Sequence, residues 1–199
     1  KQSQNNRSEI AVVQEIHAGH PLLGKLPRIQ VTYSDDQKFT DMELPHRFAD
    51  GHIRAGTIDG EPATANEAYR AVRNATPADM SAILKTAPAA AVFGGWDATR
   101  KKNQVRLRSA LVGEIIGVLA DQDRDGQDQQ SRRGGARVDA VAMSVQLDPK
   151  DMEKLIEAQE AELSDKLLDK LRGEIKKAKK DKRLSASRLG LGGIPPQLD

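Results

Sequence analysis

The chain has 199 residues and no cysteine, which excludes disulfide scaffolds, thiolate metal sites and cysteine nucleophiles. Its formal net charge of +2 is too mild to indicate a nucleic-acid partner by itself, so only the placement of the charges is informative. No apolar run approaches the roughly 20 residues that span a bilayer, and residues 1–9 are too polar for a signal peptide, so we expect a cytoplasmic protein without a membrane partner.

The first half of the chain predicts one strand and two short helices. Residues 27–35, PRIQVTYSD, alternate with β-branched side chains and end in turn formers, which indicates a strand. Residues 66–75 have helical spacing. The next helix is expected to begin with Thr76 as its N-cap, Pro77 at the first helical position and Asp79 closing a capping box.

The middle of the chain is apolar, basic and rich in glycine. We expect residues 89–96, AAAVFGGW, to form a buried strand that opens into a basic loop. Apolar residues at helical spacing then predict a largely buried helix over residues 105–120. One strip of that helix carries small residues behind Arg106, a surface that another backbone can approach.

The last third predicts a loop, a strand and one long helix. Residues 121–135 are polar and rich in glycine, as in an exposed loop, and residues 136–148 alternate as a strand. Asp148 is expected to cap a helix over 149–183, with Pro149 at its first position and an apolar stripe along it. Residues 184–199 are rich in Gly and Pro, so we expect a loop there. The sequence shows no internal repeat.

Motifs for metal binding and catalysis are incomplete. The aspartates at 121, 123 and 125 with Gly126 match the first half of a calcium loop, but Arg132 stands where a glutamate ligand is needed. His17 and His20 lack the glutamate of a zinc protease motif, and Gly19 and Pro21 disfavour a helix there. Because no nucleophile or phosphate-loop motif is present either, we expect no catalytic residue, metal or cofactor.

Two basic stretches remain as candidate sites, each with a structural alternative. Residues 44–54 place two histidines and two arginines around a turn, which suits phosphate contact or simply an ion pair between Arg47 and Asp50. In residues 93–108, cations lie beside Trp96 and two glycines. Single-stranded nucleic acid needs cations for its phosphates and a ring for stacking, but Trp96 could equally fill the core or brace the loop.

Five segments, in this order, resemble one protein family. They are QSQNNRSE (2–9), HRFADGHIR (46–54), AAVFGGWDAT (90–99), RLRSALVGEIIG (106–117) and RLSASRLGLGGIPP (183–196). They are similar to the S-Q-A-N-R-x-E, H-R-x-x-D, F-G-x-W-[DN]-[ST], R-x-x-R-S-E-I-[IV]-[GA] and S-x-x-G-L-G-x-[IV]-P-P segments of the large backbone subunit of type I-U, or I-G, CRISPR effector complexes. Gly113 and Asn5 depart from the usual serine and alanine.

The resemblance implies an α+β fold, a modified RRM-like ferredoxin palm of the RAMP superfamily with helical and thumb-like insertions. Residues 1–148 would form this palm, 149–183 an inserted charged amphipathic helix and 184–199 a loop returning to the palm, in a chain we expect to be incomplete. Copies would assemble head to tail along a CRISPR guide RNA in an antiviral complex, Cascade. Further expected partners are the target DNA strand paired to the guide, other subunits of the complex and a recruited nuclease-helicase.

The expected RNA contacts follow from charge and motif position. They are Gln4, Asn5, Arg7, His46, Arg47, Arg54, Trp96, Arg100, Lys101, Lys102, Arg106 and Arg108. A guide of any sequence must be held by its backbone, which favours Arg and Lys and suits an aromatic content of 3%. Two alternatives remain open. One is a metal-dependent RNase using Asp50, Asp97 or residues 121–128, and the other is an interaction protein that pairs through helix 149–183.

Overall fold

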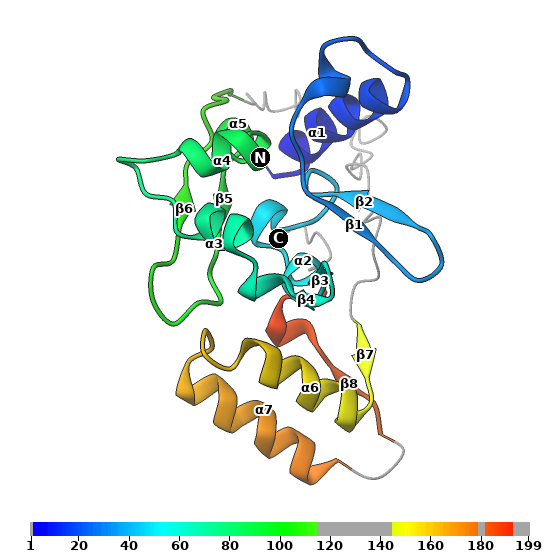
Figure 1. The fold of residues 1–199 in the computed structure, drawn as a ribbon, viewed down its shortest axis with the longest axis vertical. Coiled ribbons are helices and arrows are strands. Elements are labelled where there is room, and N and C mark those ends of the chain that lie inside the picture. The colour runs from blue at the N-terminus through cyan, green and yellow to red at the C-terminus, as the bar shows by residue number, and fades with distance from the viewer. Residues whose placement is uncertain (1, 115–144, 179–181, 193–199) are drawn as a thin grey trace, which may run out of the picture.

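The computed structural model describes residues 2–114, 145–178 and 182–192, and it confirms the α+β class. Helices alternate with short antiparallel strand pairs: β1 with β2, β3 with β4, β5 with β6 and β7 with β8. Figure 1 shows a body that holds the N-terminal elements and, below it, a helix pair formed by α6 and α7. None of the described helices has the length and apolar character needed to cross a membrane.

Helix α1, Gln2–His17, opens the chain and packs on the body through Val13 and Ile16. The strand predicted within 27–35 is confirmed as β1, Gln30–Thr32, which pairs with β2, Lys38–Thr40. Val31 lies opposite Phe39 in this pair, and both side chains pack on the same buried cluster as Leu44 and Tyr69.

The body continues through short elements that enclose its core. They are η1 Leu23–Lys25, η2 Arg47–Ala49, α2 Gly51–Arg54, β3 Thr57–Ile58, β4 Glu61–Pro62, η3 Ala63–Ala65, α3 Glu67–Arg73, α4 Ser81–Thr86 and α5 Ala89–Phe93. The helix predicted over 66–75 is confirmed as α3, which Asn66 caps by accepting from the Tyr69 amide. The predicted start of α4 is wrong. Thr76 and Asp79 bond to each other in a turn, and the helix begins only at Ser81.

The strand predicted over 89–96 is largely wrong. Residues Ala89–Phe93 form helix α5, since a run of alanines after Pro88 favours a helical turn. Gly94 then reverses the chain with a φ of 84°, where a side chain would crowd the backbone of Leu107. Only Gly95–Trp96, β5, is extended.

The helix predicted over 105–120 is also wrong in its described part. Arg106–Leu107 form strand β6, paired with β5, and residues 108–114 lie outside any helix. The main-chain oxygen of Val92 accepts from the Ser109 hydroxyl and the Leu111 amide, which holds this segment against the end of α5. Val112 is 87% exposed, so the expected buried face does not form there. Residues 115–120 lie outside the described part.

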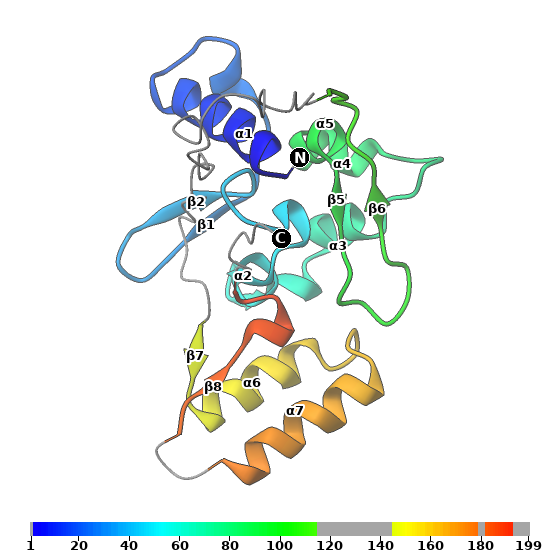
Figure 2. The same cartoon turned by 180° about the vertical axis from the view of Figure 1, so that it is seen from behind.

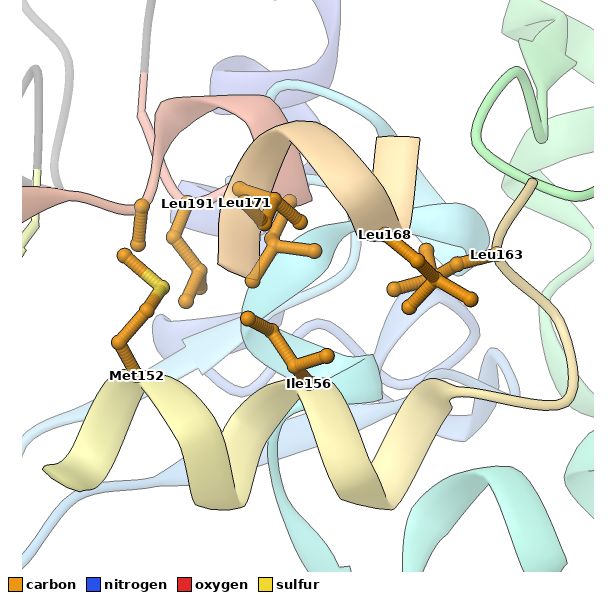
Figure 3. Packing of buried hydrophobic residues seen from close by; sticks show 8 residues of the cluster. Met152, Ile156, Leu163, Leu168, Leu171 and Leu191 are labelled. Atoms are coloured by element: carbon orange, nitrogen blue, oxygen red, sulfur yellow. The ribbon is translucent and has the colours of Figure 1, made fainter. Parts of the chain in front are cut away.

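The single helix predicted over 149–183 is wrong, because the chain folds back on itself. Asp148 caps α6, Pro149–Gln159, as predicted, but Ser164 caps a second helix, α7, Asp165–Lys177. The apolar stripe of each helix is buried against the other, and Figure 3 shows Met152 and Ile156 of α6 directed toward Leu171 and Leu191. A lone helix of this sequence would leave the stripe exposed to water.

Two strands close this helical hairpin, which we define as residues 145–178 and 182–192. Strand β7, Gln146–Leu147, pairs with β8, Leu184–Ser185, and η4, Ser187–Leu189, follows. The strand predicted over 136–148 is thus confirmed only at its end, since residues 136–144 lie outside the described part. The loop predicted over 121–135 lies outside it as well, as do residues 193–199 of the loop predicted over 184–199. Within that second loop, Leu184–Ser185 form β8 and Ser187–Leu189 form η4 instead.

Candidate nucleic-acid interface

An aromatic and cationic pair occupies the β5–β6 hairpin. Trp96 and Arg106 are cross-strand partners, and the Arg106 guanidinium lies 5.1 Å from the centre of the indole ring. Trp96 is 49% exposed, so it does not fill the core. The opposite side of β5 rests on η2, because a side chain at Gly95 would come within 2.6 Å of the Phe48 ring. The hairpin therefore presents a flat ring and a cation to solvent.

Besides Lys101, which pairs with Asp165, five of the predicted basic contacts are exposed. They are Arg7, His46, Lys102, Arg106 and Arg108. Arg7 lies on α1, where Asn5 is half-buried and Gln4 occupies the same helix. His46 precedes η2, and the remaining three lie in or beside the β5–β6 hairpin. These side chains are accessible to a phosphate.

Arg100 and Lys101 instead contact protein acceptors. Arg100 donates to the main-chain oxygen of Arg73, at 2.7 Å, and to the Asn74 side chain. The Lys101 amide donates to the main-chain oxygen of Glu162, and its ammonium lies 2.7 Å from an Asp165 carboxylate oxygen. The loop between β5 and β6 is thereby joined to the turn between α6 and α7, as Figures 1 and 2 both show.

Arg73 makes a second and buried connection between the same elements. Its guanidinium pairs with Asp97 at 2.9 Å and with Glu162 at 2.6 Å, and its side chain is only 1% exposed. Burial disfavours the charged guanidinium, but the two carboxylates outweigh that effect and raise the pKa of Arg73. The residue patterns did not indicate Arg73, because its partners are distant along the chain.

Arg54 is buried between the body and the helical hairpin. It donates to the main-chain oxygens of Ala49 and Leu189 and to the Gln159 side chain. Burial lowers the pKa of Arg54. The backbones meet here, since a side chain on Gly51 would lie 2.5 Å from the Gly190 carbonyl carbon. The segments 46–54 and 183–192 of the resemblance are therefore in direct contact through Arg54 and Gly51.

Arg47 forms an ion pair with Glu9, not with Asp50 as the structural alternative supposed. Its Nη2 lies 2.7 Å from Glu9 Oε2, and Nε makes a second hydrogen bond to Oε1. This pair joins α1 to η2 and holds Arg47 at a φ of 50°, a conformation that residues with side chains rarely adopt. Asp50 instead caps α2 and accepts from the amides of His46 and His52.

The ring of His52 faces Tyr33 in the same region. The Tyr33 hydroxyl shares a hydrogen bond with His52 Nδ1, and the centres of the two rings are 5.9 Å apart. Burial lowers the pKa of His52, while Asp50 acts in the opposite direction. A neutral ring that accepts from Tyr33 is consistent with that direction.

Acidic and histidine side chains do not gather into a metal site within residues 2–114, 145–178 and 182–192. His17 ends α1 and His20 lies beyond it, so they do not share a helical face. Asp50 and Asp97, proposed for an RNase, are both buried and bonded to protein groups. The aspartates at 121, 123 and 125 and the rest of 121–128 lie outside the described part.

Comparison with known proteins gives one family. Residues 1–122 match the family described as CRISPR-associated protein GSU0053, a range that includes α1, the β5–β6 hairpin and every predicted RNA contact. No curated protein and no solved structure matches the chain. The helical hairpin follows the matched range.

Proposed function

Because the chain belongs to the family of CRISPR-associated protein GSU0053, we propose that it is a non-catalytic subunit that binds CRISPR guide RNA through the β5–β6 hairpin and its neighbours. The observation that carries this proposal is the half-exposed Trp96 with the Arg106 guanidinium over its ring. A ring of this kind stacks on any base, and cations beside it neutralise phosphates, so recognition is independent of sequence.

The finer proposal follows the resemblance. The subunit is a RAMP backbone protein of a type I-U, or I-G, complex with an RRM-like palm, and copies polymerise head to tail along the guide. Each copy holds guide phosphates and spaces the pairing of the guide with target DNA. Other subunits and a recruited nuclease-helicase complete the antiviral complex. The carboxylates of Asp50 and Asp97 already accept hydrogen bonds from His46 and Arg73. These contacts favour a non-catalytic subunit over an RNase that uses the two carboxylates.

The alternative of helix pairing loses its main support. The apolar stripes of α6 and α7 are buried against each other and against Leu189 and Leu191. They do not form one long exposed stripe for a partner helix. The exposed cations near Trp96 are the better guide to a partner.

Titration of labelled single-stranded RNA of several unrelated sequences tests the binding residues. Lys102→Gln and Arg108→Gln should each reduce the slope of log affinity against log salt by about 0.7, equally for all sequences, because a phosphate contact carries no sequence information. Trp96→Ala should weaken binding about tenfold or more by loss of stacking. Lys38→Gln is the matched control, since Figures 1 and 2 place β2 on the opposite side of the body. Equal slopes for Lys102→Gln, Arg108→Gln and Lys38→Gln would contradict this assignment.

A further inference from the structure

Helix α7 carries a line of lysines on the face opposite its buried stripe. Leu168, Leu171 and Ile175 mark the packed side. At 100° per residue, positions 166, 170, 173 and 177 fall on the opposite side. These are Lys166, Lys170, Gly173 and Lys177, and the three lysines are exposed.

These lysines are not neutralised by described residues. Of the three acids nearest in sequence, Asp165 contacts Lys101 and Glu174 contacts Arg188, while the exposed Asp169 directly precedes Lys170. Among the ion pairs of residues 2–114, 145–178 and 182–192, none includes Lys166, Lys170 or Lys177. Their charge is therefore available to an anionic partner.

The surface of the helical hairpin offers charge without an apolar anchor. The large apolar side chains exposed in the described residues lie on the body, such as Leu84 and Val92, and none lies in 145–178 or 182–192. A protein partner usually needs a buried aromatic or aliphatic anchor, whereas a polyanion is held by distributed cations. A phosphate backbone fits this face better than a protein.

The lysine line begins beside the loop between Trp96 and Arg106. The ammonium of Lys101, in the middle of this loop, contacts Asp165, the first residue of α7 and the neighbour of Lys166 in the chain. The line from Lys166 to Lys177 then extends about 16 Å along the axis, which is about five phosphates at a stacked rise of about 3.4 Å.

We propose that α7 continues the single-stranded RNA path of the β5–β6 hairpin, with Lys166, Lys170 and Lys177 as phosphate contacts. This inference rests on the proposed function. It adds a second segment of RNA surface beyond residue 122, outside the matched family range. The continuity with Trp96, whose ring stacks on an unpaired base, indicates a single strand over a duplex.

The test uses Lys170→Gln/Lys177→Gln and a matched double, Lys150→Gln/Lys154→Gln, which removes the same charge from α6 of the same hairpin. Each is titrated with single-stranded RNA of about 6 and about 16 nucleotides, lengths within the range of single-strand sites. For the longer RNA, the α7 double should show a salt slope shallower by about 1.4 than wild type, while the control double keeps the wild-type slope. For the shorter RNA, all three proteins should agree.

The failures of the two proposals are distinguishable. If wild type binds both RNAs and the two doubles behave alike on the longer one, the α7 path is wrong while the hairpin site stands. If the α7 double keeps wild-type affinity for the longer RNA but loses affinity for duplex DNA of the same length, titrated in parallel, the assignment to single-stranded RNA is overturned. If wild type binds neither RNA, the proposed function falls and the inference falls with it. Thermal melts of both doubles confirm that the variants are folded.

Discussion

Asp41 is fully buried, and one of its carboxylate oxygens has no hydrogen-bond partner within the described part of the chain. The other oxygen accepts from the Ile29 amide. Burial raises the pKa of Asp41 to about 7, and the nearby charge of Glu9 adds to the rise. The native state therefore holds a proton that the unfolded chain loses near pH 4, so this stabilising contribution declines as the pH rises from about 4 to about 7.

Asp41→Asn should remove this pH dependence. A rise of about three pKa units corresponds to ~4 kcal/mol, so the variant should be more stable than wild type at pH 8 by up to that amount and similar to it at pH 4. Chemical denaturation at several pH values measures the difference. Asp35→Asn, at an exposed position, serves as the control. A constant difference between Asp41→Asn and wild type across this range would refute a titrating Asp41.

Two glycines should respond to alanine with opposite signs. At Gly51 the new methyl group would lie 2.5 Å from the Gly190 backbone, and this overpacking should destabilise the fold by ~1–3 kcal/mol. At Gly173, inside α7, none of the described residues lies within 4 Å of the new atom. Gly173→Ala should therefore stabilise by ~0.5–1 kcal/mol through helix propensity. Denaturant midpoints measure both, and a neutral Gly51→Ala would show that the two backbones are not in close contact.

Elements far apart in the sequence are joined by buried arginines. Arg73 of α3 reaches Asp97 after β5 and Glu162 between α6 and α7, while Arg54 of α2 reaches Gln159 at the end of α6. Each guanidinium is buried and shared between the body and the helical hairpin. These contacts fix the position of the basic loop relative to α7, on which both RNA proposals depend.

Arg73→Gln should cost about 3–5 kcal/mol of stability, because it leaves Asp97 buried without the opposite charge it has in the native fold. Arg70→Gln removes the same charge from the exposed side of α3 and should change stability by less than about 0.5 kcal/mol. Urea unfolding of both variants measures the contrast. Similar losses from the two would mean that the buried network contributes little.

The elements that sequence patterns predicted are those specified by neighbouring residues. Asn66 and Asp148 cap α3 and α6 through amides two or three residues away, so both starts are readable locally. Strand β6 is different, because its extended form depends on pairing with Gly95 and Trp96 across a loop. The break between α6 and α7 likewise depends on burial of two apolar stripes against each other.

The candidate site was predictable in composition but not in arrangement. Charge and motif position indicated the cations near Trp96, yet nothing local shows that Lys101 faces Asp165 or that Arg54 is enclosed. Both outcomes depend on contacts between distant parts of the chain. Lys101 and Asp165 are 64 residues apart in the sequence, and Arg54 and Leu189 are 135 residues apart. The exposure of Trp96 likewise depends on how distant segments pack around it, which its neighbours in the sequence do not show.

In the whole molecule, the proposed RNA path runs over the β5–β6 hairpin and α7. If both proposals hold, this chain carries guide RNA in the cell. The most direct measurement is the ratio of absorbance at 260 and 280 nm for protein co-expressed with a CRISPR array, followed by sizing of the RNA that survives nuclease. We expect a high ratio and protected RNA of discrete length. A ratio typical of pure protein, with no protected RNA, would contradict it.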